Sequence, residues 1–184
     1  MNPPLMPTPG AGFDQPFELL SACHDRVQRS LDLLCRLQAH LATHGADAQA
    51  QDAARDVLRY FDIAAPLHHE DEERHVFPAL LAADAGRHGA LVARLQDDHR
   101  RMAAAWPAAR AALQAVADGR WTTDAAPAAA QAWQDFAVLY GPHITAEEQL
   151  AYPAARALAD AEAAHAMGAE MAARRGLTAV NPGR

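Results

Sequence analysis

Apolar residues recur along this chain every three or four positions, the spacing of one face of an α-helix. The first such stripe consists of Leu19, Leu20, Val27, Leu31, Leu34, Leu37 and Leu41. It begins after Asp14 and Pro16, residue types that favour a helix start, and Gly45 supplies a stop. The pattern therefore predicts a long first helix between Pro16 and Gly45.

Three further apolar stripes follow. They predict helices from near residue 47, over about 90–117, and from the capping signal TTD to roughly residue 159. The segment ADAGRHG, residues 83–89, is expected to be a loop, and a last short helix is expected at about 161–174. No segment alternates with period two over the length of a strand. The predicted fold is all-α: an antiparallel up-down four-helix bundle with a short extra C-terminal helix.

Length and composition fit one domain. Of the 184 residues 51% are hydrophobic but only 6% are aromatic, because alanine is abundant, and alanine is the strongest helix former. We expect residues 1–12, rich in Pro and Gly, to be disordered. Residues 13–175 are expected to form the domain, and residues 176–184 a flexible tail.

Charge and hydropathy argue against two classes of partner. The net charge is −7, whereas nucleic acid is bound by a clustered basic face, so no nucleic-acid partner is expected. No apolar run approaches the length that spans a bilayer, and the first twelve residues lack the basic start and apolar core of a signal peptide. We expect a cytoplasmic protein without membrane association.

A charged run in the second predicted helix contains candidate metal ligands. The stretch HHEDEERHVFP, residues 68–78, holds three histidines and four acidic residues. A solvated helix face is the commoner explanation for such a run. However, HITAEEQLAYP, residues 143–153, repeats its His at the first position, its Glu at the fifth and sixth, its aromatic residue at the tenth and its Pro at the eleventh. Because a solvated face has no reason to repeat this pattern, the repeat favours a metal site.

The repeat has an offset of 75 residues and extends to the other two helices. The pairs it relates are His24 and His99, His68 and His143, and Glu72 and Glu147. The chain is therefore predicted to be a doubled helical hairpin, with halves at about 13–87 and 88–162. Histidines on all four helices in one register indicate a site on the pseudo-twofold axis of the bundle.

The residue types in this site suit metal ions. Residues four apart on a helix have Cβ atoms about 5 to 6 Å apart, so each His-x-x-x-Glu pair can present a nitrogen and an oxygen to one point. Four imidazoles and two carboxylates suit two first-row metal ions that the carboxylates bridge. Two Glu side chains in a core without a cation would be costly, so burial and metal binding are expected together.

These motifs resemble the hemerythrin family, specifically its HHE cation-binding group. The resemblance covers about residues 18–158 and depends on the paired HxxxEExxxxP motifs with His24 and His99 placed before them. It implies a four-helix bundle with a non-haem di-iron centre of two iron ions, which binds oxygen or a related small molecule such as nitric oxide or peroxide. The ligands that it implies are His24, His68, Glu72, His99, His143 and Glu147.

Two features depart from the oxygen-carrying members of that family. Those proteins have a second histidine four residues after the first on the third helix, where this chain has Ala103. They also place the last carboxylate five residues after the final histidine, which would select Glu148, whereas the internal repeat favours Glu147 as the partner of Glu72. The missing imidazole argues against simple oxygen carriage and predicts an open position at one ion.

Other polar residues of the motif receive simpler interpretations. The residues expected at the surface or as supports of the ligands are His69, His75, Glu70 and Glu73. Three functions stay open: a di-iron protein that binds or senses small molecules or handles iron, a di-iron enzyme of the peroxidase, oxidase or iron-sulfur repair type, and a zinc-bound or metal-free interaction bundle. We expect a binding protein more than an enzyme, and no oligomeric state is predicted.

Overall fold

A computed structural model of the chain describes residues 12–177. All regular elements in this range are helical, and no strand occurs in it, so the prediction of an all-helical protein is confirmed. Of the segments expected to be disordered or flexible, residues 1–11 and 178–184 lie outside the described residues.

The first helix, α1 (Pro16–His44), forms as the apolar stripe predicts. Pro16 occupies its first turn, where a proline costs no hydrogen bond. Gly45 follows the helix with a φ of 68°, a left-handed conformation that favours glycine, and its N–H donates to Leu41 O.

The second helical rod is continuous through several elements. Its start is capped by Asp47, whose carboxylate accepts a hydrogen bond from the N–H of Ala50. Its elements are α2 (Ala48–Arg59), η1 (Tyr60–Ala64), α3 (Ala65–Asp71), η2 (Glu72–Val76) and the beginning of α4 (Phe77–Ala117). The elements η1 and η2 are π-helical turns.

The π-helical turns have a common cause. Each ends two residues before a proline, namely Pro66, Pro78 or Pro153, and the residue between donates its N–H five residues back. A proline ring clashes with the carbonyl four residues earlier in an α-helix, and a wider turn relieves this clash without ending the rod. Two of the turns, η2 and η4, begin at Glu72 and Glu147.

The prediction of a loop over residues 83–89 is wrong in its length, because the observed break is shorter. Helix α4 is interrupted at one residue, Asp84, whose backbone is extended with φ −162° and ψ 93°. The Asp84 carboxylate accepts a hydrogen bond from the N–H of Arg87, so it caps a new helix start at once. The third long helix therefore starts near residue 85 instead of residue 90.

The last rod follows a short connection after Ala117. The predicted capping segment TTD forms a 3-10 turn, η3 (Thr123–Ala125), without a side-chain cap. The remaining elements are α5 (Ala126–Ala137), α6 (Tyr140–Ala146), η4 (Glu147–Ala151), α7 (Tyr152–Leu158) and α8 (Ala161–Arg174). The observed α8 matches the predicted final helix.

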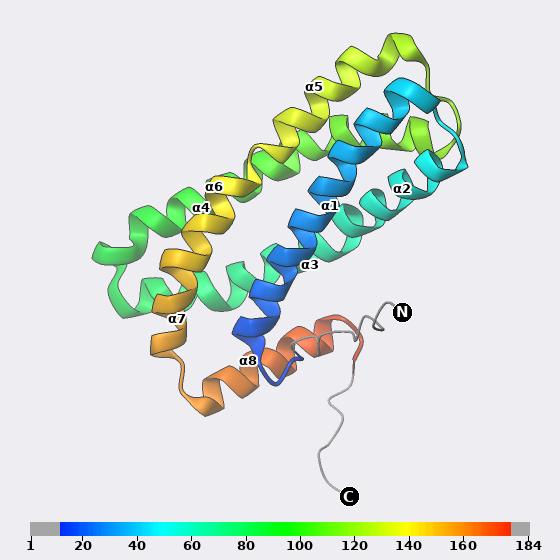
Figure 1. The fold of residues 1–184 in the computed structure, drawn as a ribbon. Coiled ribbons are helices and arrows are strands. Elements are labelled where there is room, and N and C mark those ends of the chain that lie inside the picture. Colours follow the sequence, from blue (N-terminus) through cyan, green and yellow to red (C-terminus); the bar gives the residue numbers. More distant parts are fainter. Residues whose placement is uncertain (1–11, 178–184) are drawn as a thin grey trace, which may run out of the picture.

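The long rods lie side by side, and α8 crosses the end of the bundle at which α1 begins (Figure 1). The buried apolar residues form two clusters. One contains Phe61, Trp133 and Phe136, and the other contains Phe77 and Tyr152. On the first three rods the candidate ligands fall between the segments that supply these two clusters, and on the last rod they fall where the two segments meet. The bundle thus holds a polar layer between two apolar cores.

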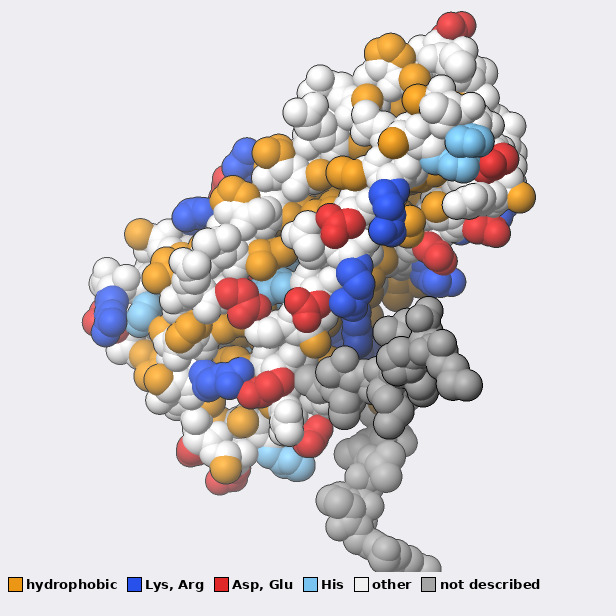
Figure 2. Space-filling view, viewed as in Figure 1, with side chains coloured by type: hydrophobic (Ala, Val, Ile, Leu, Met, Phe, Trp, Pro, Cys, Tyr) orange, Lys and Arg blue, Asp and Glu red, His pale blue; other side chains and the backbone are white. Residues whose placement is uncertain are grey.

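The surface carries mixed charge. On the face shown in Figure 2, acidic and basic side chains are interspersed over the described part of the chain. Between residues 12 and 177, no helix combines the length and the apolar character that crossing a bilayer requires.

Candidate metal centre

The structure brings all six predicted ligand residues into the interior of the bundle. They come from four rods, and each residue is at most 7% exposed. The positions are His24 on α1, His68 on α3, Glu72 at the start of η2, His99 on α4, His143 on α6 and Glu147 at the start of η4. Charged and imidazole side chains are rarely buried to this degree without a partner.

The six side chains form two groups that share both glutamates. The first group is His24, His68, Glu72 and Glu147, and the second is His99, His143, Glu72 and Glu147. In each group the potential ligand atoms all lie within 4.8 Å of one another. The internal repeat therefore becomes two neighbouring groups, each of which could hold a metal ion.

Each glutamate divides its two oxygens between the groups. Glu72 Oε1 lies 3.3 Å from His68 Nε2, and Glu72 Oε2 lies 3.3 Å from His99 Nε2. Glu147 Oε2 lies 3.1 Å from His24 Nε2, and Glu147 Oε1 lies 3.1 Å from His143 Nε2. Bonds of about 2.0 to 2.2 Å to one ion would place neighbouring ligand atoms roughly 3 to 3.5 Å apart. The observed spacings fit this geometry.

Many buried polar atoms in this layer lack a hydrogen-bond partner within the described residues. They are His68 Nδ1 and Nε2, His99 Nε2, His143 Nδ1 and Nε2, Glu72 Oε2, and both carboxylate oxygens of Glu147. Buried polar atoms in proteins are nearly always paired, and an unpaired one costs about 1 to 3 kcal/mol. Cations between the two groups would satisfy these donor atoms, so the residues present fit a metal centre.

The electrostatics of the layer favour the metal-binding form at some of these groups and the protonated form at others. Burial lowers the pKa of His24, but the neighbouring carboxylates of Glu147 and Glu72 outweigh it and raise that pKa to about 9. Burial, together with the charge of Glu147, raises the pKa of Glu72 to about 7. Burial also disfavours the charge on Glu147, but the neighbouring imidazoles of His143 and His24, each with a nitrogen 3.1 Å from a Glu147 oxygen, outweigh it and lower the Glu147 pKa. Burial and the neighbouring charge of His24 hold the pKa of His68 well below its usual value. A neutral imidazole and an ionised carboxylate are the forms that bind metal.

A pair of carboxylates outside the layer orients two of the histidines. The Nδ1 of His24 lies 2.7 Å from Glu148 Oε1, and the Nδ1 of His99 lies 3.0 Å from Glu73 Oε1. Glu73 and Glu148 are themselves related by the 75-residue offset. A carboxylate on Nδ1 leaves Nε2 free to face a metal. The structure thus places Glu147 in the layer and Glu148 behind His24.

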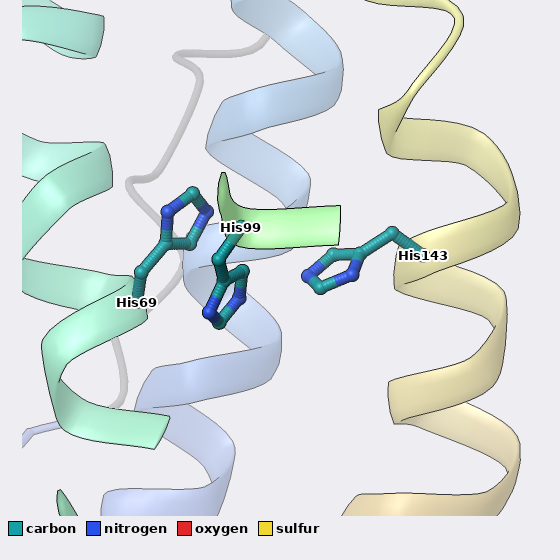
Figure 3. A group of neighbouring side chains, drawn as sticks. All are labelled: His69, His99 and His143. Atoms are coloured by element: carbon teal, nitrogen blue, oxygen red, sulfur yellow. The ribbon is translucent and has the colours of Figure 1, made fainter. Parts of the chain in front are cut away.

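His69 lies closer to the centre than the sequence suggested. Its ring stacks on that of His99 with centroids 4.1 Å apart, and its ligand atom lies within 4.8 Å of those of His99 and His143 (Figure 3). Of the two places expected for His69, at the surface or as a support of the ligands, the structure agrees with the second, since the side chain is partly buried against His99. The signal available in the sequence was Ala103, which leaves space on α4 beside His99.

Tyr152 is a second residue whose position the sequence did not reveal. Its hydroxyl donates a hydrogen bond to Glu72 Oε1, and its ring stacks on that of His24 with centroids 5.3 Å apart. Its counterpart in the repeat, Phe77, lies 5.6 Å from the ring of His99 and carries no hydroxyl. The Tyr-for-Phe difference was visible in the sequence, but its contact with a ligand was not.

Helix α8 and the residue after it contact the outer side of the motif at residues 68–78. Asp71, fully buried beside Glu72, accepts hydrogen bonds from Arg174 and from Arg175, the latter with an N–O distance of 2.7 Å. His75, expected at the surface or as a support of the ligands, is partly buried, and its Nε2 lies 2.6 Å from a carboxylate oxygen of Glu170. These contacts tie the last helix to the rod that carries His68 and Glu72.

Comparison with known proteins agrees with this geometry. Residues 15–155 match the hemerythrin HHE cation binding domain. An uncharacterized protein from Haemophilus influenzae is 31% identical over 172 residues, which cover 93% of this chain and 96% of that protein. The chain belongs to the hemerythrin HHE cation-binding family.

Proposed function

We propose that this protein holds a non-haem di-iron centre in the polar layer and binds a small molecule there. One ion would be held by His24 and His68, and the other by His99 and His143, with Glu72 and Glu147 shared between them. His69 would add a third imidazole to the second ion. Domain residues 13–175 would form the functional unit, with the rods alternating in direction as an up-down bundle.

The observation that carries this proposal is that Glu72 and Glu147 each direct one carboxylate oxygen to the first group and the other oxygen to the second. Each has one oxygen within 3.3 Å of an imidazole of the first group and the other within 3.3 Å of an imidazole of the second. A single four-ligand ion, as zinc prefers, would leave one of the two groups unused. Imidazole and carboxylate ligands together suit iron.

Bound iron would supply exchangeable coordination positions and electrons for oxygen, nitric oxide or peroxide. The protein residues control what surrounds those positions. Tyr152 holds its hydroxyl proton against Glu72 on the side of His24, and the two apolar clusters exclude water from both ends of the layer. A carboxylate behind each of His24 and His99 fixes the ring orientation.

Metal analysis of the protein as purified, combined with absorption spectroscopy, tests the proposal. We expect two iron ions per chain, an absorption characteristic of ferric iron, loss of this absorption on reduction, and its return in air. A colourless protein with zinc as its metal would contradict the di-iron assignment and favour an interaction bundle.

An enzymatic function is the second candidate, because Tyr152 places a proton donor next to a ligand. Turnover of hydrogen peroxide with a reductant separates the two candidates. A binding protein should consume no more peroxide than it holds iron, whereas a peroxidase should consume it in many cycles.

A further inference from the structure

A pocket of about 200 Å³ lies beside the second group of ligands, between α3 and α4. Its outer part is formed by Pro66, Ala103 and Trp106, of which Pro66 and Ala103 are exposed. Its inner part is formed by buried aromatic residues, including Phe136 and Tyr140. The pocket therefore leads from the surface into the apolar cluster that contains Phe61 and Phe136, next to the polar layer.

His69 forms the wall of this pocket that faces the metal centre. Its ring stacks at 4.1 Å on the ring of His99, and in Figure 3 it lies on the side of His99 away from His143. Within the described residues its ring nitrogens make no side-chain hydrogen bond. One imidazole thus separates the pocket from His99.

The lining sets the chemical class of the occupant. It contains aromatic rings, Met102 and small side chains, and no Asp, Glu, Lys or Arg. A charged molecule would lose its hydration there without a compensating partner. An apolar molecule would gain by leaving water, and an apolar cavity of about 150 Å³ is large enough for xenon or benzene.

Ala103 keeps the pocket open. It stands one helical turn after His99, and its methyl group is part of the lining. A long side chain at this position would project into the 200 Å³ that the pocket provides. The neighbouring Ala104 is also exposed but does not line the pocket, so it offers a matched control.

We propose that this pocket binds a small, uncharged, apolar molecule against His69. The occupant is either a dissolved gas or a compact organic ring, which share this chemistry. Binding in the pocket depends on its shape and lining alone. Its use as a route to the second ion rests on the function proposed above.

Crystals of the full-length protein under xenon pressure, and crystals soaked in benzene, test the pocket directly. We expect xenon in the pocket of the wild type and of Ala104→Leu, and at least a tenfold loss of occupancy in Ala103→Leu. Ala103→Met is a second filling variant in case leucine perturbs the helix. Benzene in addition to xenon would identify a ring-sized site, whereas xenon alone would identify a site for gases.

Two outcomes would overturn the proposal: no xenon or benzene in the wild-type pocket, or equal xenon occupancy in both filling variants. Metal analysis of the same crystals keeps this result separate from the di-iron proposal. If the pocket binds xenon but the protein holds no iron, the proposed binding site is supported, and only its use as a route to the second ion is rejected.

Discussion

The two groups of ligands arise from one repeated motif, but their surroundings differ. Beside His24, the first group has the phenol of Tyr152, which donates to Glu72. Beside His99, the second group has Phe77, the extra imidazole of His69, and the apolar pocket. The repeat thus accounts for the shared ligands, and single substitutions within it make the two positions chemically different.

If each group holds one ion, as proposed above, this difference indicates a division of roles between the two ions. The phenol draws negative charge from one oxygen of Glu72, which weakens that carboxylate as a ligand for the first ion. The second position gains a neutral donor in His69 and an apolar approach through the pocket. We therefore expect the second position to bind metal more tightly and to be the one that an apolar molecule reaches.

Removing a shared glutamate should have the largest effect on metal content. Glu72→Ala and Glu147→Ala should each lower occupancy at both positions, because each carboxylate faces both groups. Metal per chain, measured by mass spectrometry, should fall from two towards zero. Glu162→Ala, an exposed residue of α8, should keep both ions. Two metal ions per chain in Glu72→Ala or in Glu147→Ala would contradict the proposal that both carboxylates bind both ions.

Removing one histidine should affect one position. His68→Ala should lower occupancy at the first position and His143→Ala at the second, so each variant should hold about one ion per chain. The same measurement checks this, with His88→Ala as the control because His88 lies outside both groups. Equal loss of both ions in the two variants would contradict separate positions.

The sequence predicted the polar layer better than the details around it. Helical periodicity gave the four rods, and the 75-residue offset paired the six buried side chains, because both depend on regular spacing along the chain. The π-helical turns were missed since each needs the competition between a proline and the carbonyl four residues back, which periodicity does not contain. The stacking of His69 on His99 could not be predicted, because this contact depends on how two rods pack.

Removing His69 should weaken the second position alone. His69→Ala deletes an imidazole whose ligand atom lies within 4.8 Å of those of His99 and His143. We expect the affinity for the second ion to fall by roughly 10-fold to 100-fold, the range seen when groups next to a metal ligand are lost. Competition against a chelator of known affinity measures this.

Adding Ala103→His to this variant should recover part of the affinity, because position 103 stands one turn after His99 and borders the same space. In the wild type, Ala103→His should change the affinity little, since His69 already occupies that side. Strong tightening by Ala103→His in the wild type would show that His69 does not act on the second ion.

The smallest expected effect comes from removing a single hydroxyl group, which is present beside the first position and absent beside the second. Tyr152→Phe removes the donor to Glu72 Oε1 and makes the first position resemble the second, where Phe77 stands. Because Glu72 then keeps its full negative charge for the metal, we expect the affinity for the first ion to rise by a few fold. The difference in affinity between the first and the second ion, measured by chelator competition, should therefore narrow. Phe77→Tyr is the mirror variant: its hydroxyl would face the second group, lower the affinity there, and narrow the same difference from the other side. A difference that widens in Tyr152→Phe would show that the phenol supports the first position by holding Glu72 in place, and that orientation of the carboxylate outweighs its charge.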